Sequence, residues 1–188
     1  DQEMSRGLGD VYKRQKHQWM AMLLFAPMVW LEVPPSFAQS LFDRPPTRVM
    51  IHNPESTEGL RNRTTITVLV PEDAGNSLRG IVLRQLPNLD QWDWGRLEPR
   101  VYLGDYFLRG KGTSGLVSAV VSESEEVLNI KLTPAIQPGQ TVNVVFHGFN
   151  PQSSIYQWST ELLAAGEDPV RYVGPTLRVN VYEQDPYR

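Results

Sequence analysis

The fold class is indicated first by Thr64-Thr65-Ile66-Thr67-Val68-Leu69-Val70, a stretch in which six of the seven side chains branch at Cβ. Branched side chains favour extended backbone, because they fit the pleated surface of a sheet better than the crowded surface of a helix. The stretch ends at Pro71, and Gly75 follows soon after. Since neither residue continues a strand easily, we predict a β-strand over residues 64–70.

The same extended character returns along the rest of the chain. Apolar and polar residues alternate, as in Leu128-Asn129-Ile130-Lys131-Leu132, and a period of two buries one face of a strand. After residue 40 only Leu162–Ala165 fits a helical turn. The predicted strands are residues 64–70, 78–86, 100–103, 116–122, 128–132, 142–146, 156–162 and 177–181.

These short strands are separated by turn-forming residues, among them Gly95, Gly110, Pro138-Gly139 and Pro151. Short strands at such regular spacing are typical of a β-sandwich. We therefore predict an all-β protein, an immunoglobulin-like β-sandwich of about seven or eight strands. A barrel is the alternative architecture.

The N-terminal region has the pattern of a secretory signal peptide. Basic residues precede the apolar run Trp19–Leu31, and Ser36-Phe37-Ala38 supplies the small residues of a cleavage site. A membrane anchor is disfavoured, because a spanning helix needs about 20 apolar residues and this run contains Pro27. We predict a signal peptide over residues 16–38, cleavage after Ala38 and an extracytoplasmic location, in the periplasm, at the cell surface or in the medium.

Residues 1–15 fit neither a signal peptide nor a folded element, and Ser5–Gln15 resembles translated adapter sequence from assembled reads. We interpret them as a non-native extension. Residues 39–188 then form a single β-sandwich domain, without a membrane span once the signal peptide is removed.

Composition excludes several classes of function. The chain has 188 residues, 18 Lys and Arg against 21 Asp and Glu, a net charge of −3 and no cysteine. The charge disfavours a nucleic-acid partner, and the lack of cysteine excludes disulfides, thiolate zinc sites, iron–sulfur clusters and a cysteine nucleophile.

Several motifs follow one another in a specific order after the first predicted strand. They are Pro71-Glu72-Asp73-Ala74-Gly75 with Leu78, Pro138-Gly139-Gln140-Thr141-Val142, Asn150-Pro151, Ile155-Tyr156, Gly166 with Pro169, and Tyr172-Val173-Gly174. Their order resembles a cyanobacterial family of secreted proteins, domain of unknown function number 2808. The resemblance covers about residues 45–183 and implies a secreted or periplasmic β-rich domain, with no assigned activity and no catalytic residue. Asn-Pro before a tyrosine-bearing strand is also similar to immunoglobulin-like modules of bacterial surface proteins.

The segment Asp90-Gln91-Trp92-Asp93-Trp94 is the first candidate site. Flat indole faces bind sugar rings and carboxylates accept hydrogen bonds from sugar hydroxyls, so the segment could form a carbohydrate platform. We favour the other interpretation, in which Trp92 or Trp94 covers one end of the core, because tryptophan is usually buried. Paired acid and base chemistry by Asp90 and Asp93 receives little weight, since carboxylates in an extended loop need not converge.

His52 and His147 form the second candidate site, for copper or zinc, because imidazole suits both metals. The two histidines have no metal-site spacing, so we favour exposed, solvated histidines and place His147 on the outward face of its strand. With no catalytic signature, we expect a non-enzymatic interaction or envelope-associated module without a cofactor. Its partner would be an unknown protein or an envelope glycan, while carbohydrate binding through the tryptophans and metal binding through the histidines are the alternatives.

Overall fold

The computed structural model describes residues 40–108, 112–124 and 126–185. Regular structure in these ranges consists of thirteen strands without an α-helix. The helical turn predicted at Leu162–Ala165 is wrong, because the strand β11 (Ser154–Ala164) continues through it. The predicted extension and signal peptide lie outside the described residues. Within them, no helix is long and apolar enough to cross a membrane.

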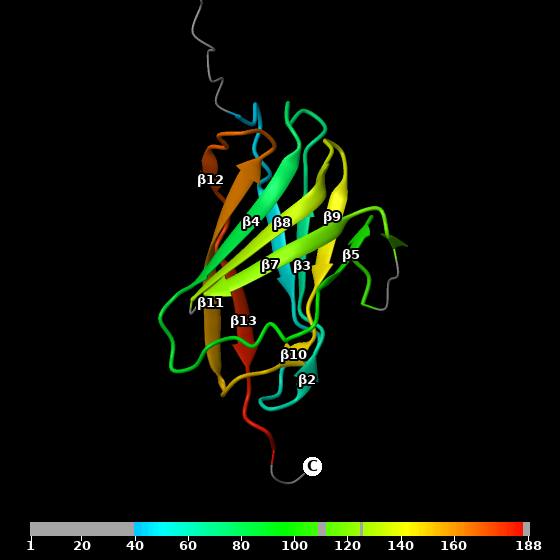
Figure 1. Cartoon of the computed structure of the whole chain (residues 1–188). Coiled ribbons are helices and arrows are strands. Elements are labelled where there is room, and N and C mark those ends of the chain that lie inside the picture. The colour runs from blue at the N-terminus through cyan, green and yellow to red at the C-terminus, as the bar shows by residue number, and fades with distance from the viewer. Residues whose placement is uncertain (1–39, 109–111, 125, 186–188) are drawn as a thin grey trace, which may run out of the picture. The chain divides into compact units, whose positions relative to one another are not determined.

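Two antiparallel sheets face each other (Figure 1). The first has the order β1-β3-β9-β5-β6, and the short ladder of β10 and β2 prolongs the register of β9 and β3. Its strands are β1 (Arg48–His52), β3 (Thr65–Leu69), β5 (Arg100–Leu103), β6 (Thr113–Ser114) and β9 (Thr141–Val145), with β2 (Arg61–Asn62) and β10 (Gly148–Phe149) in the ladder.

The second sheet has the order β12-β11-β4-β8-β7. β13 also pairs with β11, so β12 and β13 lie end to end along the edge of β11 that faces away from β4. Besides β11, its strands are β4 (Leu78–Gln85), β7 (Ser118–Ser124), β8 (Val127–Ile136), β12 (Arg171–Val173) and β13 (Leu177–Val181). The two sheets share no ladder within the described ranges, which confirms the predicted sandwich over the barrel.

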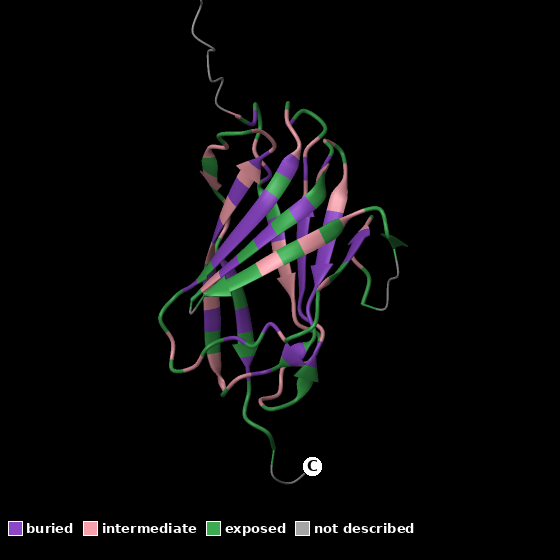
Figure 2. Cartoon of the chain, in the orientation of Figure 1, coloured by how far each residue is buried: buried purple, intermediate pink, exposed green. Residues whose placement is uncertain are grey.

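The core lies between the sheets and follows the alternation seen in the sequence. Ile66 and Val68 of β3 face Leu83 of β4 and Leu162 of β11, and all four are fully buried. Figure 2 shows buried and exposed residues alternating along β8 and β13. Nine strands have four or more residues, slightly more than predicted, because the sequence pattern did not separate β1 from its surroundings.

One long connection, residues 86–99, joins β4 of the second sheet to β5 of the first. In Figure 1 this crossover segment is the green loop that runs below β7. It passes where β4 has ended at Gln85 while β11 continues to Ser154. Leu86 N–H donates to the carbonyl of Gln157 at 2.8 Å, so the segment begins beside the part of β11 that β4 no longer covers.

The outer face of the first sheet is unusually buried for a sandwich surface. Thr65, Thr67 and Asn143 point to this face, opposite to Ile66, and all three are buried. Asn143 accepts a hydrogen bond from Thr67 Oγ1 at 2.7 Å and donates Nδ2 to the carbonyl of Gly104 at 2.7 Å. The chain after β5 therefore covers these polar residues. Thr65 Oγ1 is buried without a hydrogen-bond partner among the described atoms.

This contrast between two threonines of one strand gives a stability test. Thr67→Val removes a buried hydrogen bond and should lower the free energy of unfolding by about 1 to 2 kcal/mol. Thr65→Val replaces an unpartnered buried hydroxyl by a methyl group and should raise it by about 1 kcal/mol. Urea unfolding of the two variants measures both changes, and equal destabilisation by both would contradict the account of this face.

Candidate functional site

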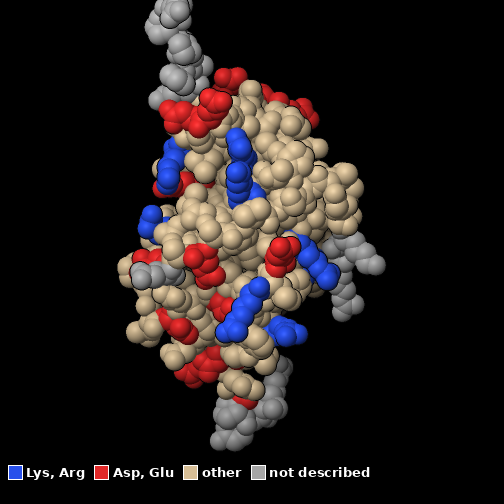
Figure 3. All heavy atoms as spheres, in the orientation of Figure 1, with Lys and Arg blue, Asp and Glu red and all other residues tan. Residues whose placement is uncertain are grey.

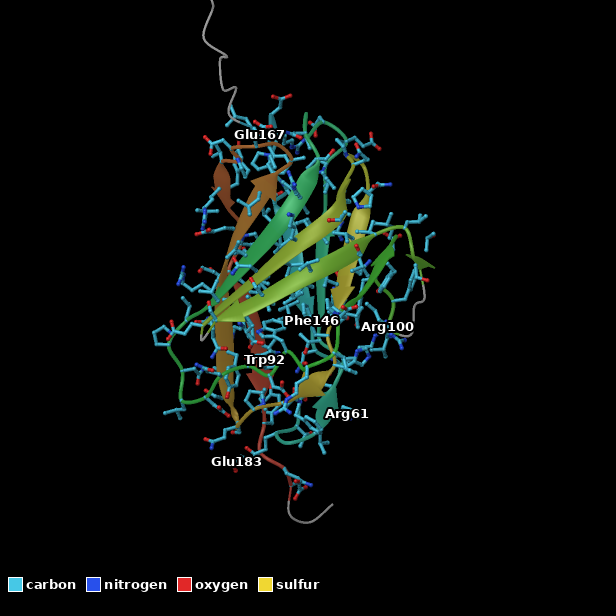
Figure 4. All side chains as sticks on the ribbon, viewed as in Figure 1. Arg61, Trp92, Arg100, Phe146, Glu167 and Glu183 are labelled. Carbon is cyan, nitrogen blue, oxygen red and sulfur yellow. The ribbon has the colours of Figure 1, made fainter. Side chains whose placement is uncertain are left out.

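The crossover segment points its two tryptophans into the core. Trp92 is 3% exposed and Trp94 is 5% exposed. Gln91, which precedes Trp92, and Asp93, which lies between the two tryptophans, are exposed to solvent. Figure 4 shows Trp92 on this segment in the lower half of the sandwich, with Phe146 above it. The interpretation of these tryptophans as core residues is confirmed.

Five rings from three segments meet at this end of the core, and we call them the aromatic cluster: Trp92, Trp94, Phe146, Tyr156 and Trp158. Trp92 packs edge to face on Trp158, with centroids 5.3 Å apart and planes at 88°. Trp94 packs edge to face on Phe146 at 5.1 Å. Such geometry places the positive edge of one ring against the negative face of another, and contributes about 0.5 to 1.5 kcal/mol per pair beyond burial.

The carbohydrate platform through Trp92 and Trp94 does not fit this placement. Sugar stacking needs an exposed ring face, and both indoles are covered by the other members of the aromatic cluster. The same burial explains the high pKa of Tyr156, which burial raises to about 12. The Tyr156 hydroxyl therefore stays protonated, and it donates a hydrogen bond to the carbonyl of Gln152 at 2.8 Å. The rings at this end of the core are buried against one another and have a structural role.

The two carboxylates of the motif bind backbone amides. Asp93 accepts from the N–H of Gly95 at 2.8 Å with Oδ1 and from the N–H of Phe149 at 2.9 Å with Oδ2. Asp90 accepts from the N–H of Gln91 at 2.8 Å and from the N–H of Gln152 at 3.3 Å. The carboxylates thus fasten the crossover segment to β10 and to the loop before β11, and they do not converge as an acid and base pair.

Other contacts complete this attachment. The buried side chain of Gln85 donates to the carbonyl of Asp90 at 2.8 Å and accepts from the N–H of Trp92 at 2.9 Å. Two glycines allow the backbones to touch: a Cβ on Gly95 would lie 2.0 Å from the carbonyl oxygen of His147, and one on Gly148 would lie 2.1 Å from that of Asp93. Larger residues at these glycines would push the segment off the sheet.

Sequence reasoning assigned Asn150-Pro151 to turn geometry alone and missed a buried asparagine network. Asn150 is 3% exposed. Its Nδ2 donates to the carbonyls of Glu55 and Thr57 at 2.9 Å and 2.8 Å, and its Oδ1 accepts from Asn62 Nδ2 at 2.8 Å. The network holds the loop after β1 onto the ladder of β2 and β10. Its partners lie almost a hundred residues away, so no local pattern could reveal it.

His52 differs from the exposed histidine that we predicted. Its ring stacks on Tyr106, with centroids 3.5 Å apart and planes at 4°. Nε2 is buried without a hydrogen-bond partner among the described atoms, and burial lowers the pKa of His52. The prediction was wrong because the chain after β5 folds back over the end of β1, which local sequence does not show.

His147 is exposed, as predicted. Strand β3 separates β9 from β1, and therefore lies between the two histidines. Partial desolvation and the positive charges of Arg100, Arg63 and Arg61 lower the pKa of His147. A field that disfavours a proton also disfavours a metal cation. No group of three or more His, Cys, Asp and Glu side chains within the described ranges is arranged to hold a metal ion.

The chain is thus an all-β sandwich in which the carboxylates and indoles of the candidate motif hold the crossover segment against both sheets. It belongs to the family described as Protein of unknown function (DUF2808), whose sequence profile matches residues 39–180. This match confirms the predicted membership in domain of unknown function number 2808, whereas the cyanobacterial origin and the secretion stay predictions. No match was found among curated proteins.

Several solved structures are similar to the chain. One is an uncharacterised protein from Nocardia farcinica with an immunoglobulin-like fold, at 13% identity and a TM-score of 0.45, covering 71% of this chain and 97% of that one. A collagen-binding domain from a Staphylococcus aureus adhesin has 8% identity and a TM-score of 0.37, covering 71% and 96%. The N-terminal domain of the Streptococcus gordonii adhesin Sgo0707 has 15% identity and a TM-score of 0.41, covering 73% and 33%. Likenesses at this level carry no information on ligands.

Replacing members of the motif should therefore cost stability. We expect Trp94→Ala to lower the free energy of unfolding by about 3 to 5 kcal/mol, and Asp93→Ala by about 1 to 3 kcal/mol, because two backbone amides lose their acceptor. The matched control is Asp105→Ala, which removes an exposed carboxylate outside these contacts and should change stability by less than about 0.5 kcal/mol. Urea unfolding measures all three, and equal values for Asp93→Ala and Asp105→Ala would contradict the fastening role.

Proposed function

We propose that the chain is an extracytoplasmic, non-enzymatic module that binds a component of the cell envelope. The observation that carries this proposal is that the motif Asp90–Trp94, which looked most like an active site in the sequence, has a structural role. Both oxygens of Asp90 and of Asp93 accept backbone N–H groups. Carboxylates held in this way have a structural role, since they attach the crossover segment to β10 and to the loop before β11.

The nature of the surface also supports an interaction role. Exposed apolar side chains of the described part include Phe107, Phe149 and Leu108, which are 64%, 50% and 58% exposed. Two of them lie next to arginines, since Arg63 donates to the carbonyl of Leu108 at 3.3 Å and the Arg61 guanidinium lies 5.6 Å from the Phe149 ring centroid. Aromatic and arginine side chains side by side are enriched in binding surfaces.

The location is supported by the sequence pattern before residue 39. An apolar run of thirteen residues, Trp19–Leu31, and the small residues around Ala38 form the leader pattern. The family profile begins at residue 39, directly after the predicted cleavage site. A leader followed by a family domain is the arrangement that an exported module requires.

Export can be tested with the full chain, given an initiating methionine and a C-terminal tag and expressed in a Gram-negative host. We expect the protein in the periplasm with Gln39 as its first residue. The matched control carries Leu23→Arg and Leu24→Arg, which interrupt the apolar run and should leave the precursor uncleaved in the cytoplasm. Cytoplasmic retention of the parent chain would contradict the proposed location.

Envelope binding is measured by sedimenting the exported protein with the insoluble envelope fraction of its source cells. We expect it in the pellet with that fraction and in the supernatant with cytosolic material. Equal amounts in the supernatant under both conditions would contradict the envelope-binding role.

A further inference from the structure

The register of the first sheet gathers five side chains on one outer face. Val145 of β9 pairs with Arg100 of β5, and Phe149 of β10 pairs with Arg61 of β2. Because the same register runs through both ladders, His147 lies across from Arg63. Side chains two residues apart along a strand share a face, and so do side chains of directly paired residues on neighbouring strands. We call the residues on this face the arginine face: Arg61, Arg63, Arg100, His147 and Phe149.

The arginine face is open to solvent. Arg61, Arg100 and His147 are exposed, and Phe149 is 50% exposed. Figure 4 labels Arg100 on the right of the molecule near mid-height and Arg61 below it, and Figure 3 shows basic side chains on this side with acidic ones among them. This face continues below the part of the sheet that Tyr106 covers by stacking on His52. The sheet therefore has a closed upper part and an open, cationic lower part.

Two arginines of this face, Arg61 and Arg100, have no carboxylate partner among the described residues. Neither Arg61 nor Arg100 forms an ion pair with a residue of the described ranges, where the ion pairs are Arg44 with Asp73 and Arg171 with Glu161. The nearby carboxylate of Asp93 accepts backbone N–H groups. In a chain with a net charge of −3, Arg61 and Arg100 thus share one face without an ion-pair partner among the described residues.

The shape and chemistry of this face select its ligand. A guanidinium group binds a carboxylate with two parallel hydrogen bonds, and an exposed ring beside it offers an apolar face to a sugar ring. Two hollows of the described residues lie elsewhere, around Arg48 and Pro71 and around Asn88. Charged side chains spread along an open sheet face can contact successive units of an extended polymer. A nucleic-acid site would need a much more basic chain.

We propose that the arginine face binds an anionic polysaccharide, with Arg61 and Arg100 pairing its carboxylates and Phe149 stacking on a sugar ring. This inference rests on the proposed envelope-binding function, and it names the chemical class of the partner. Arg63 orients the adjacent loop, because its guanidinium donates to the carbonyl of Leu108 at 3.3 Å.

The direct test measures binding of the exported protein to polygalacturonate, a carboxylated polysaccharide, by calorimetry at low salt, with neutral dextran as the reference polymer. We expect binding to polygalacturonate alone, weakened by salt. Arg61→Gln combined with Arg100→Gln should weaken it about tenfold, and Phe149→Ala about threefold. The matched control Arg84→Gln removes an exposed charge from β4 of the other sheet and should change it less than about twofold.

The outcomes separate this inference from the function on which it rests. If the double variant and Arg84→Gln weaken binding equally, the assignment of binding to this face is overturned. No binding to polygalacturonate, or preference for anionic vesicles or single-stranded DNA, would overturn the ligand class, while sedimentation with the envelope would still uphold the proposed function. Loss of both polygalacturonate binding and envelope sedimentation would overturn both. Thermal unfolding confirms that each variant is folded.

His147 provides a second readout on the same face. Its pKa is lowered from 6.5 by partial desolvation and by Arg100, Arg63 and Arg61, and bound carboxylates would offset the charge of these arginines. We therefore expect polygalacturonate to raise the pKa of His147 in NMR titrations. By linkage, binding should tighten as pH falls from the His147 pKa of the complex towards the lower His147 pKa of the free protein, and it should be independent of pH well above both. His147→Asn should abolish this dependence, and an unchanged His147 pKa on binding would contradict contact with this face.

Discussion

The contact between the crossover segment and the two sheets is the constraint on which this sandwich depends. β4 ends at Gln85 while β11 extends down to Ser154, so the second sheet becomes narrower where the first continues into β10 and β2. Without a cover, the core would open to water at that end. Trp92 and Trp94 fill the space with two large rings, and the edge-to-face contacts of the aromatic cluster hold them against β11 and Phe146.

This constraint explains why a motif with an active-site appearance is structural. An extended segment exposes alternate residues, so burying two indoles turns Asp93 toward solvent beside the backbone of β10. A free amide at that place needs an acceptor, because unpaired backbone groups are costly. The Asp93 carboxylate is this acceptor, so the crossover segment is held by its indoles in the core and by Asp93 on the backbone of β10. The motif is thus part of the fold, and the binding surface that we propose is the arginine face of the first sheet.

Local pattern predicted much of this architecture. Alternation in Leu128–Leu132 and branching in Thr64–Val70 identified strands, and the burial of Trp92 followed from the general preference of tryptophan. Features that depend on distant partners were not predictable. Asp93 accepts a hydrogen bond from an amide 56 residues away, and Asn150 donates hydrogen bonds to carbonyls more than 90 residues away. The local sequence around either residue does not indicate such distant partners.

Two errors have the same origin. Leu162–Ala165 has enough helix-forming residues to suggest a turn of helix, but pairing with β4 and β12 keeps this part of β11 extended through Ala164. His52 was expected in solvent, yet Tyr106 covers it. In both cases a tertiary contact overrides a local preference, as is common for short segments.

Hydrogen exchange of the tryptophan indole N–H groups, followed by NMR on the full chain, tests the role of the crossover segment most directly. If Trp92 and Trp94 belong to the core, their indole protons exchange only when the whole sandwich unfolds, at the same rate as that of Trp158 and the amides of β3. Fast exchange at Trp92 and Trp94, with slow exchange at Trp158, would show that the segment opens independently and would contradict the account.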